Sequence, residues 1–178
     1  AKTPFAGAVE FAGTYAGKLT VSSKGLAFGI WSVDVEMKDI TGVWNISGET
    51  GAGVMALGDM SFGNISGNKT ITAKGGDAYL LATGFGEAIR PTGNISLNSI
   101  SGNVKVSAYG DACMILAYGN LSVKDLSKLN LQVTSKTDDA CGIHLEQQNL
   151  VMQSTGLKVG KINVKTLHTA EGFFVRGK

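Results

Sequence analysis

The chain has 178 residues, of which 17% are charged and 25 are glycine, with only 2 prolines and 2 cysteines. A formal net charge of +2, with lysines and arginines scattered singly, argues against a nucleic-acid-binding surface. An apolar content of 43% disfavours disorder, and no apolar run is long enough for a membrane-spanning helix. These properties predict a single folded domain over residues 1–178 that does not insert into membranes.

A unit of about 25 residues recurs along the chain, and its clearest copy is Ser101–Leu126. This copy holds three short apolar alternations bounded by Gly, Asp or Asn, which is typical of strands joined by turns. Such a unit is too short for a crossover helix and cannot enclose a core alone, so its copies must stack. The sequence therefore predicts an all-β fold, a right-handed, single-stranded parallel β-helix (β-solenoid) of about five to six coils.

In chain order, residues 1–16 fit no complete copy and are expected to form a partial N-terminal coil or a cap. Five coils are expected over residues 17–162, and residues 163–178 begin a partial C-terminal coil. The five copies are Gly17–Ile40, Thr41–Ile65, Ser66–Ile100, Ser101–Leu126 and Ser127–Ile162.

Three recurring positions set the expected register between coils. The last strand of each copy closes on an aliphatic residue, namely Ile40, Ile65, Ile100, Leu126 and Ile162. A bend residue of a type that tolerates positive φ precedes this strand, so a left-handed conformation is expected there. These bend residues are Asp34, Asp59, Asn94, Asn120 and Gly156. A small residue opens each middle strand, namely Ala27, Ala52, Ala78, Ala112 and Ala140.

The third and fifth copies depart from the common length. Lys69 falls at an inward position of the third copy, so we expect a one-residue bulge there that leaves Ile71 inside. Extra residues at 83–92 and 146–154 are expected to project between the second and third strands, on a face of the kind that often binds ligands. The candidate residues of these binding loops are Phe85, Glu87, Arg90, Gln147 and Asn149.

The two cysteines occupy equivalent places in successive copies, because each follows an Asp-Ala pair. Stacked parallel strands bring equivalent Cα atoms to about 4.8 Å, which is within disulfide range. Cys113 and Cys141 are therefore either two free thiols packed in a column or a disulfide between coils, which requires an oxidising compartment. A metal site is not expected at these thiols, because we expect no His or further Cys beside them.

The turn before the middle strand carries Asp77, Asp111 and Asp139 in three consecutive copies. Stacked carboxylates repel one another, and a bound Ca²⁺ ion would relieve this repulsion. The alternative is an Asx turn, in which each Asp side chain binds backbone N–H groups of its own bend. His144 and His168 fall in different copies without a nucleophile elbow, so no catalytic residue and no enzyme activity are predicted.

The phrases ISGNVKVSAYGDACMILAYGNLSVKDL and NISGNKTITAKGGDAYLLATG resemble repeats of a known kind. They are similar to the degenerate repeats of bacterial exported parallel β-helix proteins, in particular autotransporter passenger and adhesin segments. The resemblance covers residues 17–162. It implies an extracellular, cell-surface β-helix that serves adhesion, display or scaffolding.

Incomplete coils at both ends predict how the protein assembles. We expect the last coil of one subunit to receive the N-terminal strand of the next, which would give a head-to-tail fibre. The expected function is an extracellular structural or adhesive solenoid. The alternatives are a carbohydrate-binding β-helix that recognises surface glycans and, less favoured, a polysaccharide-degrading enzyme. The residues expected at the assembly ends are Phe5, Val9, Phe11, Phe173, Phe174 and Val175.

Overall fold

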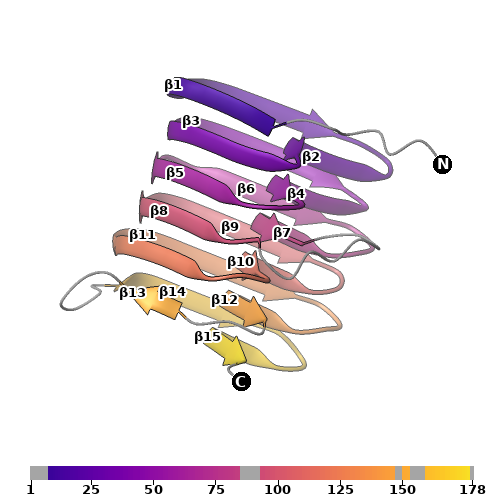
Figure 1. Ribbon diagram of the computed structural model, residues 1–178. Coiled ribbons are helices and arrows are strands. Elements are labelled where there is room, and N and C mark those ends of the chain that lie inside the picture. Colours follow the sequence, from indigo (N-terminus) through magenta and orange to yellow (C-terminus); the bar gives the residue numbers. More distant parts are fainter. Residues whose placement is uncertain (1–7, 85–92, 147–149, 153–158, 177–178) are drawn as a thin grey trace.

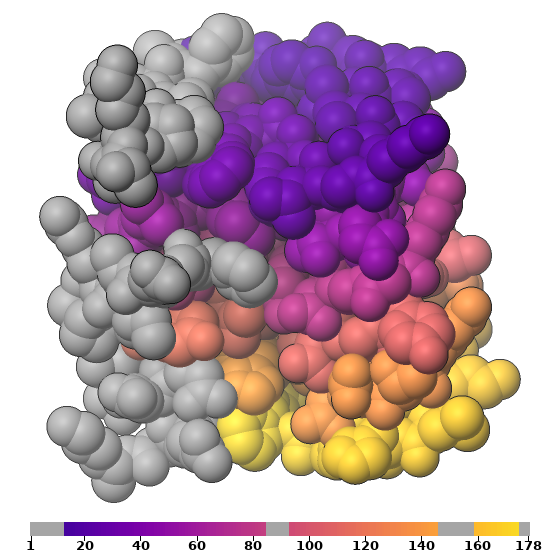
Figure 2. All heavy atoms as spheres, turned by 90° about the vertical axis from the view of Figure 1, so that its right-hand side faces the viewer, coloured from indigo at the N-terminus to yellow at the C-terminus, as the bar shows by residue number. Residues whose placement is uncertain are grey.

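The computed structural model describes residues 8–84, 93–146, 150–152 and 159–176. Within these ranges the chain winds into stacked coils whose strands of equal rank pair in parallel (Figure 1). The predicted all-β fold is confirmed as a parallel β-solenoid of about five turns. The colours of Figure 2 change in layers from indigo to yellow, because each coil occupies one level of the stack.

The middle strands of the coils form a six-stranded sheet, which is one side of the solenoid. In stacking order its strands are β2 (Leu26–Ser32), β4 (Thr50–Ala56), β7 (Ala78–Thr83), β10 (Ala112–Ala117), β12 (Ala140–Glu146) and β15 (Ala170–Arg176).

A nine-stranded sheet forms the other two sides, because three long strands run through the corner between them. The long strands are β1 (Ala8–Ser22), β3 (Asp34–Gly48) and β11 (Leu121–Ser135). The shorter strands on one side are β5 (Met60–Ile65), β8 (Ile95–Ile100) and β13 (Leu150–Met152). Those on the other side are β6 (Lys69–Ala73), β9 (Gly102–Ala108) and β14 (Val159–Lys165).

Aliphatic ladders fill the interior of the solenoid. Ile40 pairs with Ile65, which pairs in turn with Ile100, and each of the three is at most 1% exposed. Ile71 lies in a second ladder, between Ile46 and Val106. Full burial of one such side chain contributes about 1.5–3 kcal/mol. Stacking therefore gives each coil the core that it cannot enclose alone.

A column of left-handed glycines marks the corner at which the long strands turn. Gly42, Gly67 and Gly102 have φ of 95°, 85° and 88°. A Cβ on Gly102 would lie 2.6 Å from the carbonyl oxygen of Gly67, and a Cβ on Gly67 would collide with the carbonyl oxygen of Gly42. Only glycine therefore permits the coils to approach this closely while the chain turns.

The predicted Asp and Asn bend column has a different role from these glycines. The backbone N–H of Asp59 donates to Asp34 Oδ1 (2.8 Å), that of Asn94 to Asp59 Oδ1 (2.7 Å) and that of Asn120 to Asn94 Oδ1 (2.8 Å). Short side chains with an acceptor oxygen thus satisfy the N–H of the next coil at a bend. Gly156, the last predicted member of the column, lies outside the described residues.

Two predictions of which residues stack between coils are wrong, one in the small-residue column and one in the fifth coil. Gly51, not Ala52, stacks between Ala27 and Ala78, and Ala52 faces outward beside Tyr79. The alanine pattern predicted the wrong residue here because glycine fits a small-residue column equally well.

In the fifth coil the third strand is β13, since Leu150 pairs with Leu121. Ile162 accordingly belongs to the next coil, where it pairs with Leu131, and it does not continue the Ile65 column. Compared with the fourth coil, this coil has one extra residue between Leu145 and Leu150 and four between Met152 and Val159, whereas the prediction placed the whole excess at 146–154. Apolar residues alternate both around Leu150 and around Val159–Ile162, so the pattern alone did not show which of the two segments is the third strand of this coil.

The bulge predicted at Lys69 is also wrong. Lys69 pairs with Trp44 and Val104 in an uninterrupted ladder, and it is 1% exposed. Its methylene stem lies in the core, and its Nζ donates to the carbonyl oxygens of Gly42 (2.9 Å) and Ser66 at the glycine corner. Burial lowers the pKa of this amine to about 8.

Candidate functional site

The outer face of the six-stranded sheet carries a second apolar cluster, outside the main core. Two consecutive residues of each central strand point inward, such as Leu80 with Leu81 and Met114 with Ile115. This double inward step shifts the outward positions along the strand and gives two outward columns. The buried members of the cluster are Ala52, Met55, Tyr79, Ala82, Cys113, Leu116 and Cys141.

A groove of about 540 Å³ lies along the last coils of this face. Three aspartates and Glu171 supply its acidic residues, and the rings of Tyr79, Tyr118 and Phe174 supply its apolar surface. Its complete lining is Asp77, Tyr79, Asp111, Cys113, Leu116, Tyr118, Asp139, Ala140, Cys141, His144, Thr169, Glu171 and Phe174. The groove is therefore the candidate functional site.

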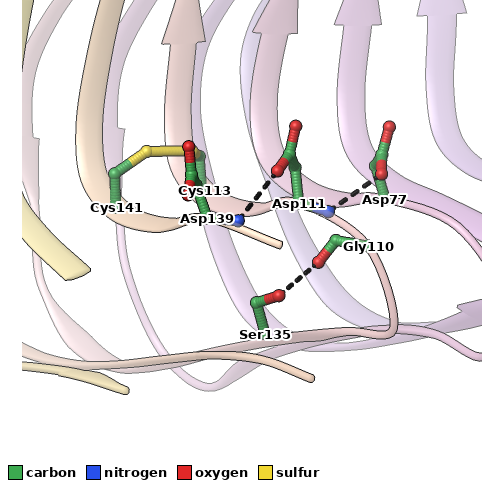
Figure 3. The surroundings of a disulfide bond; sticks show 7 residues. All are labelled: Asp77, Gly110, Asp111, Cys113, Ser135, Asp139 and Cys141. Carbon is green, nitrogen blue, oxygen red and sulfur yellow. Dashed lines mark hydrogen bonds between the residues drawn. A yellow bond between two sulfur atoms is a disulfide. The ribbon is translucent and has the colours of Figure 1, made fainter. Parts of the chain in front are cut away.

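The three aspartates form a row along the stack (Figure 3). The backbone N–H of Asp111 donates to Asp77 Oδ1 (2.9 Å), and that of Asp139 donates to Asp111 Oδ1 (3.0 Å). Each carboxylate thus accepts from the next coil, whereas the Asx-turn alternative placed the donor in its own bend. Asp77 and Asp139 are two coils apart, about 10 Å by strand spacing. The carboxylates make a line rather than a cluster, and the Ca²⁺ site remains a prediction.

Hydrogen bonds from β11 and to the preceding coil hold the bend that carries Asp111 in place. The hydroxyl of Ser135, which is only 3% exposed, donates to the carbonyl oxygen of Gly110 (2.6 Å; Figure 3). The backbone N–H of Gly110 donates to the carbonyl oxygen of Gly76 (3.0 Å). The carboxylate row is therefore fixed by the coil backbone.

The carboxylates of the row have different neighbours: Asp111 lies among other carboxylates, whereas Asp139 lies beside a histidine. Burial raises the pKa of Asp111, with further contributions from the negative charges of Asp77, Asp138 and Asp139, while the hydrogen bond from the Asp139 N–H opposes the rise. At the end of the row, Asp139 Oδ1 lies 2.6 Å from His168 Nδ1. This contact lowers the pKa of Asp139 and raises that of His168.

Tyr79 lies beside the same row. Burial raises the pKa of its hydroxyl, and the negative charges of Asp77 and Asp111 and a hydrogen bond to Asp77 raise it further. The phenol therefore remains protonated at neutral pH, as a polar group at the edge of the apolar cluster.

Cys113 and Cys141 form a disulfide between neighbouring coils, with their Cα atoms 4.7 Å apart. Of the two alternatives for these cysteines, the structure has the covalent one, and neither cysteine is free. The bond joins β10 to β12 at the floor of the groove.

The structure also brings a histidine to this disulfide, contrary to the expectation from the sequence. One donor nitrogen of His144 and the two sulfur atoms all lie within 4.8 Å of one another. Strict alternation would place His144 and Cys141, three residues apart, on opposite faces. The double inward step at Gly142 and Ile143 returns both to the outer face. No residue type in the sequence signals that step.

The remaining predicted site residues are only partly described. The loop residues Phe85, Glu87, Arg90, Gln147 and Asn149 and the end residue Phe5 lie outside the described residues. At the N-terminal end, Val9 pairs with Val35 and Phe11 with Met37. At the other end, the partners of Phe173, Phe174 and Val175 are Ile143, His144 and Leu145.

Comparison of the chain with protein-family models, curated proteins and solved structures gave no match. No helix in the described ranges is long and apolar enough to cross a membrane.

Proposed function

We propose that this chain is an extracellular structural or adhesive solenoid that continues head to tail into a surface fibre. The observation that carries this proposal is the order of the strands at the two ends. Among the described strands, β1 and β2 have a free edge at one end of the stack. The free edges at the other end belong to β13, β14 and β15.

The strands at the two ends follow one another in the right order around the coil. If a second copy is placed below the first, the beginning of its β1 follows β13, the end of its β1 follows β14, and its β2 follows β15. The three sides of the solenoid then continue across the junction in their normal order. Unpaired parallel edges bind such strands readily, and a contact that does not close into a ring propagates.

Exposed apolar side chains gather at the same two ends. Leu26 and Trp31 of β2 are 58% and 38% exposed. At the opposite end, Leu167 is 91% exposed and Phe173 of β15 is 40% exposed. In the proposed junction Trp31 stacks next to Phe174 in one outward column, which removes apolar surface from water.

The coil-to-coil disulfide supports an extracellular location, because disulfides persist in oxidising compartments. It also links two coils covalently, which suits a scaffold that bears load. We propose no catalytic step for this role.

Electron microscopy and sedimentation of the purified chain test the proposal. We expect fibres from the wild type, and shorter particles from Trp31→Glu and Phe173→Glu, which place charge in the junction. Tyr109→Glu is the matched control, because Tyr109 is 46% exposed on the body of the stack. A strictly monomeric wild type at high concentration would contradict the proposal.

A second candidate function, glycan binding, is favoured by the groove. Aromatic rings beside hydrogen-bonding carboxylates suit ligands that are both hydroxyl-rich and partly apolar. A glycan array with and without a chelator tests this candidate together with the predicted Ca²⁺. Binding that disappears in Tyr118→Ala would support it, whereas an array without any bound glycan would exclude it.

A further inference from the structure

We propose that reduction of the disulfide creates a metal site in which Cys113, Cys141 and His144 bind a thiophilic divalent ion such as Zn²⁺. The proposal concerns the reduced state of the groove floor, and it is independent of fibre formation. It begins from the three side chains that the double inward step brings to one place on the outer face.

The donor atoms are already close to a coordination geometry. The two sulfurs and the His144 nitrogen lie within 4.8 Å of one another. Zinc binds sulfur at about 2.3 Å and imidazole nitrogen at about 2.0 Å, so donors around one ion stand roughly 3.3–3.8 Å apart. The two thiolates must separate from bonding distance and the imidazole must approach by about 1 Å. Side-chain rotation alone can make these movements on fixed strands.

The surroundings favour an ion at this point. The ring of Phe174 packs on that of His144, with centroids 4.6 Å apart, and Leu116 lies beside His144 on the previous strand. These contacts hold the imidazole next to the sulfurs. The groove gives access from solvent and leaves a fourth position for water, while Glu171 is the next residue after Cys141 in the same column. The carboxylates along the groove attract cations to it.

The change of state is a balanced thiol–disulfide exchange. A dithiol reductant supplies two electrons and two protons, its own sulfurs become a disulfide, and Cys113 and Cys141 become thiols. Metal binding then releases these two protons, because the thiolates are the ligands. The oxidised protein has no thiolate to offer. The disulfide and the metal therefore exclude each other, and the redox state decides whether the ion binds.

Titration with Co²⁺ tests the proposal, because thiolate-bound tetrahedral Co²⁺ absorbs in the near-ultraviolet and visible ranges. After reduction and removal of the dithiol, we expect both absorptions at one equivalent of Co²⁺ and their loss on addition of Zn²⁺. The oxidised protein and Cys113→Ser should lack them. His144→Ala should weaken binding at least about tenfold. His168→Ala is the matched control, because it removes the only other histidine, and it should change affinity less than about twofold.

A second measurement guards against binding by unfolded chains. Zinc should raise the unfolding midpoint of the reduced wild type and of His168→Ala, because the ion binds the folded state. It should raise that of His144→Ala by clearly less at the same zinc concentration. Reduced wild type without thiolate–cobalt absorption, or His144→Ala that binds as tightly as wild type, would overturn the proposal.

Discussion

The buried amine of Lys69 predicts an unusual dependence of stability on pH. Its ordinary pKa of 10.5 is lowered to about 8 in the folded state, because burial disfavours the charged form. Between these two values the unfolded chain binds a proton that the folded chain does not. Stability therefore rises with pH in this window and is lost again as the pH falls through 8.

The size of the effect follows from the two pKa values. Between pH 7 and pH 10, Lys69 should raise the free energy of unfolding by about 2.5 kcal/mol. Lys69→Met keeps a long apolar stem in the ladder between Trp44 and Val104 but removes the titrating group. The difference between wild type and variant cancels the other titrating groups of the chain, Tyr79 included.

Urea denaturation at pH 7, 8, 9 and 10 measures this difference. With both cysteines in the disulfide, no free thiol is available for rearrangement at high pH. The stability of wild type relative to Lys69→Met should rise through the series. Parallel pH profiles, or a wild type that loses stability relative to the variant, would refute the placement of a desolvated amine in the core.

Three other changes have defined expected results in the same denaturation assay. Gly67→Ala should destabilise the fold by at least about 2 kcal/mol, because its φ is +85° and a Cβ meets the backbone of Gly42. Gly25→Ala should change stability by less than about 0.5 kcal/mol, because a Cβ there meets only Ser23 Oγ, at an ordinary contact distance of 3.9 Å. Equal effects of the two substitutions would contradict the close approach of the coils at the glycine corner. Asp111→Asn keeps an acceptor for the Asp139 N–H and removes a carboxylate whose pKa is raised, so stability at pH 7 should be unchanged or higher. Asp111→Ala removes the acceptor as well and should lower the free energy of unfolding by about 1 kcal/mol. A clear loss of stability in the Asn variant would contradict the repulsion between carboxylates in the row. Reduction of the disulfide, whose cysteines are 28 residues apart, should lower the free energy of unfolding by about 3.5 kcal/mol, and Cys113→Ser/Cys141→Ser should have the same effect. An unchanged urea midpoint would contradict a stabilising role of the disulfide.

The repeat pattern was sufficient to predict the solenoid, because stacked coils place similar residues in similar surroundings. Ile40, Ile65 and Ile100 recur for that reason, and the structure stacks them as expected. The pattern failed where two residue types meet the same requirement. Gly51 replaces an alanine in the small-residue column, and Lys69 replaces an aliphatic residue because its stem is apolar and its amine reaches backbone carbonyls.

The candidate site was predictable only in part, since it depends on which way each side chain points. The equivalent places of Cys113 and Cys141 indicated a contact, and the structure shows a disulfide there. His144 was missed because the strand departs from alternation at Gly142. The aspartates were found in the correct column, but their donors belong to the next coil, a relation that local turn chemistry does not reveal.

Head-to-tail continuation is tested most directly by a covalent bond across the proposed junction. Thr20 and Asn163 are the first and last members of one exposed column on the β6 side, at opposite ends of the stack. In the proposed fibre, Asn163 of one copy lies one strand spacing from Thr20 of the next. Oxidation of Thr20→Cys/Asn163→Cys should therefore give a ladder of dimers, trimers and longer species on a non-reducing gel. Thr20→Cys/Ser96→Cys, with one cysteine on a central strand, should give no ladder. A Thr20→Cys/Asn163→Cys protein that stays monomeric after oxidation at high concentration would contradict the fibre.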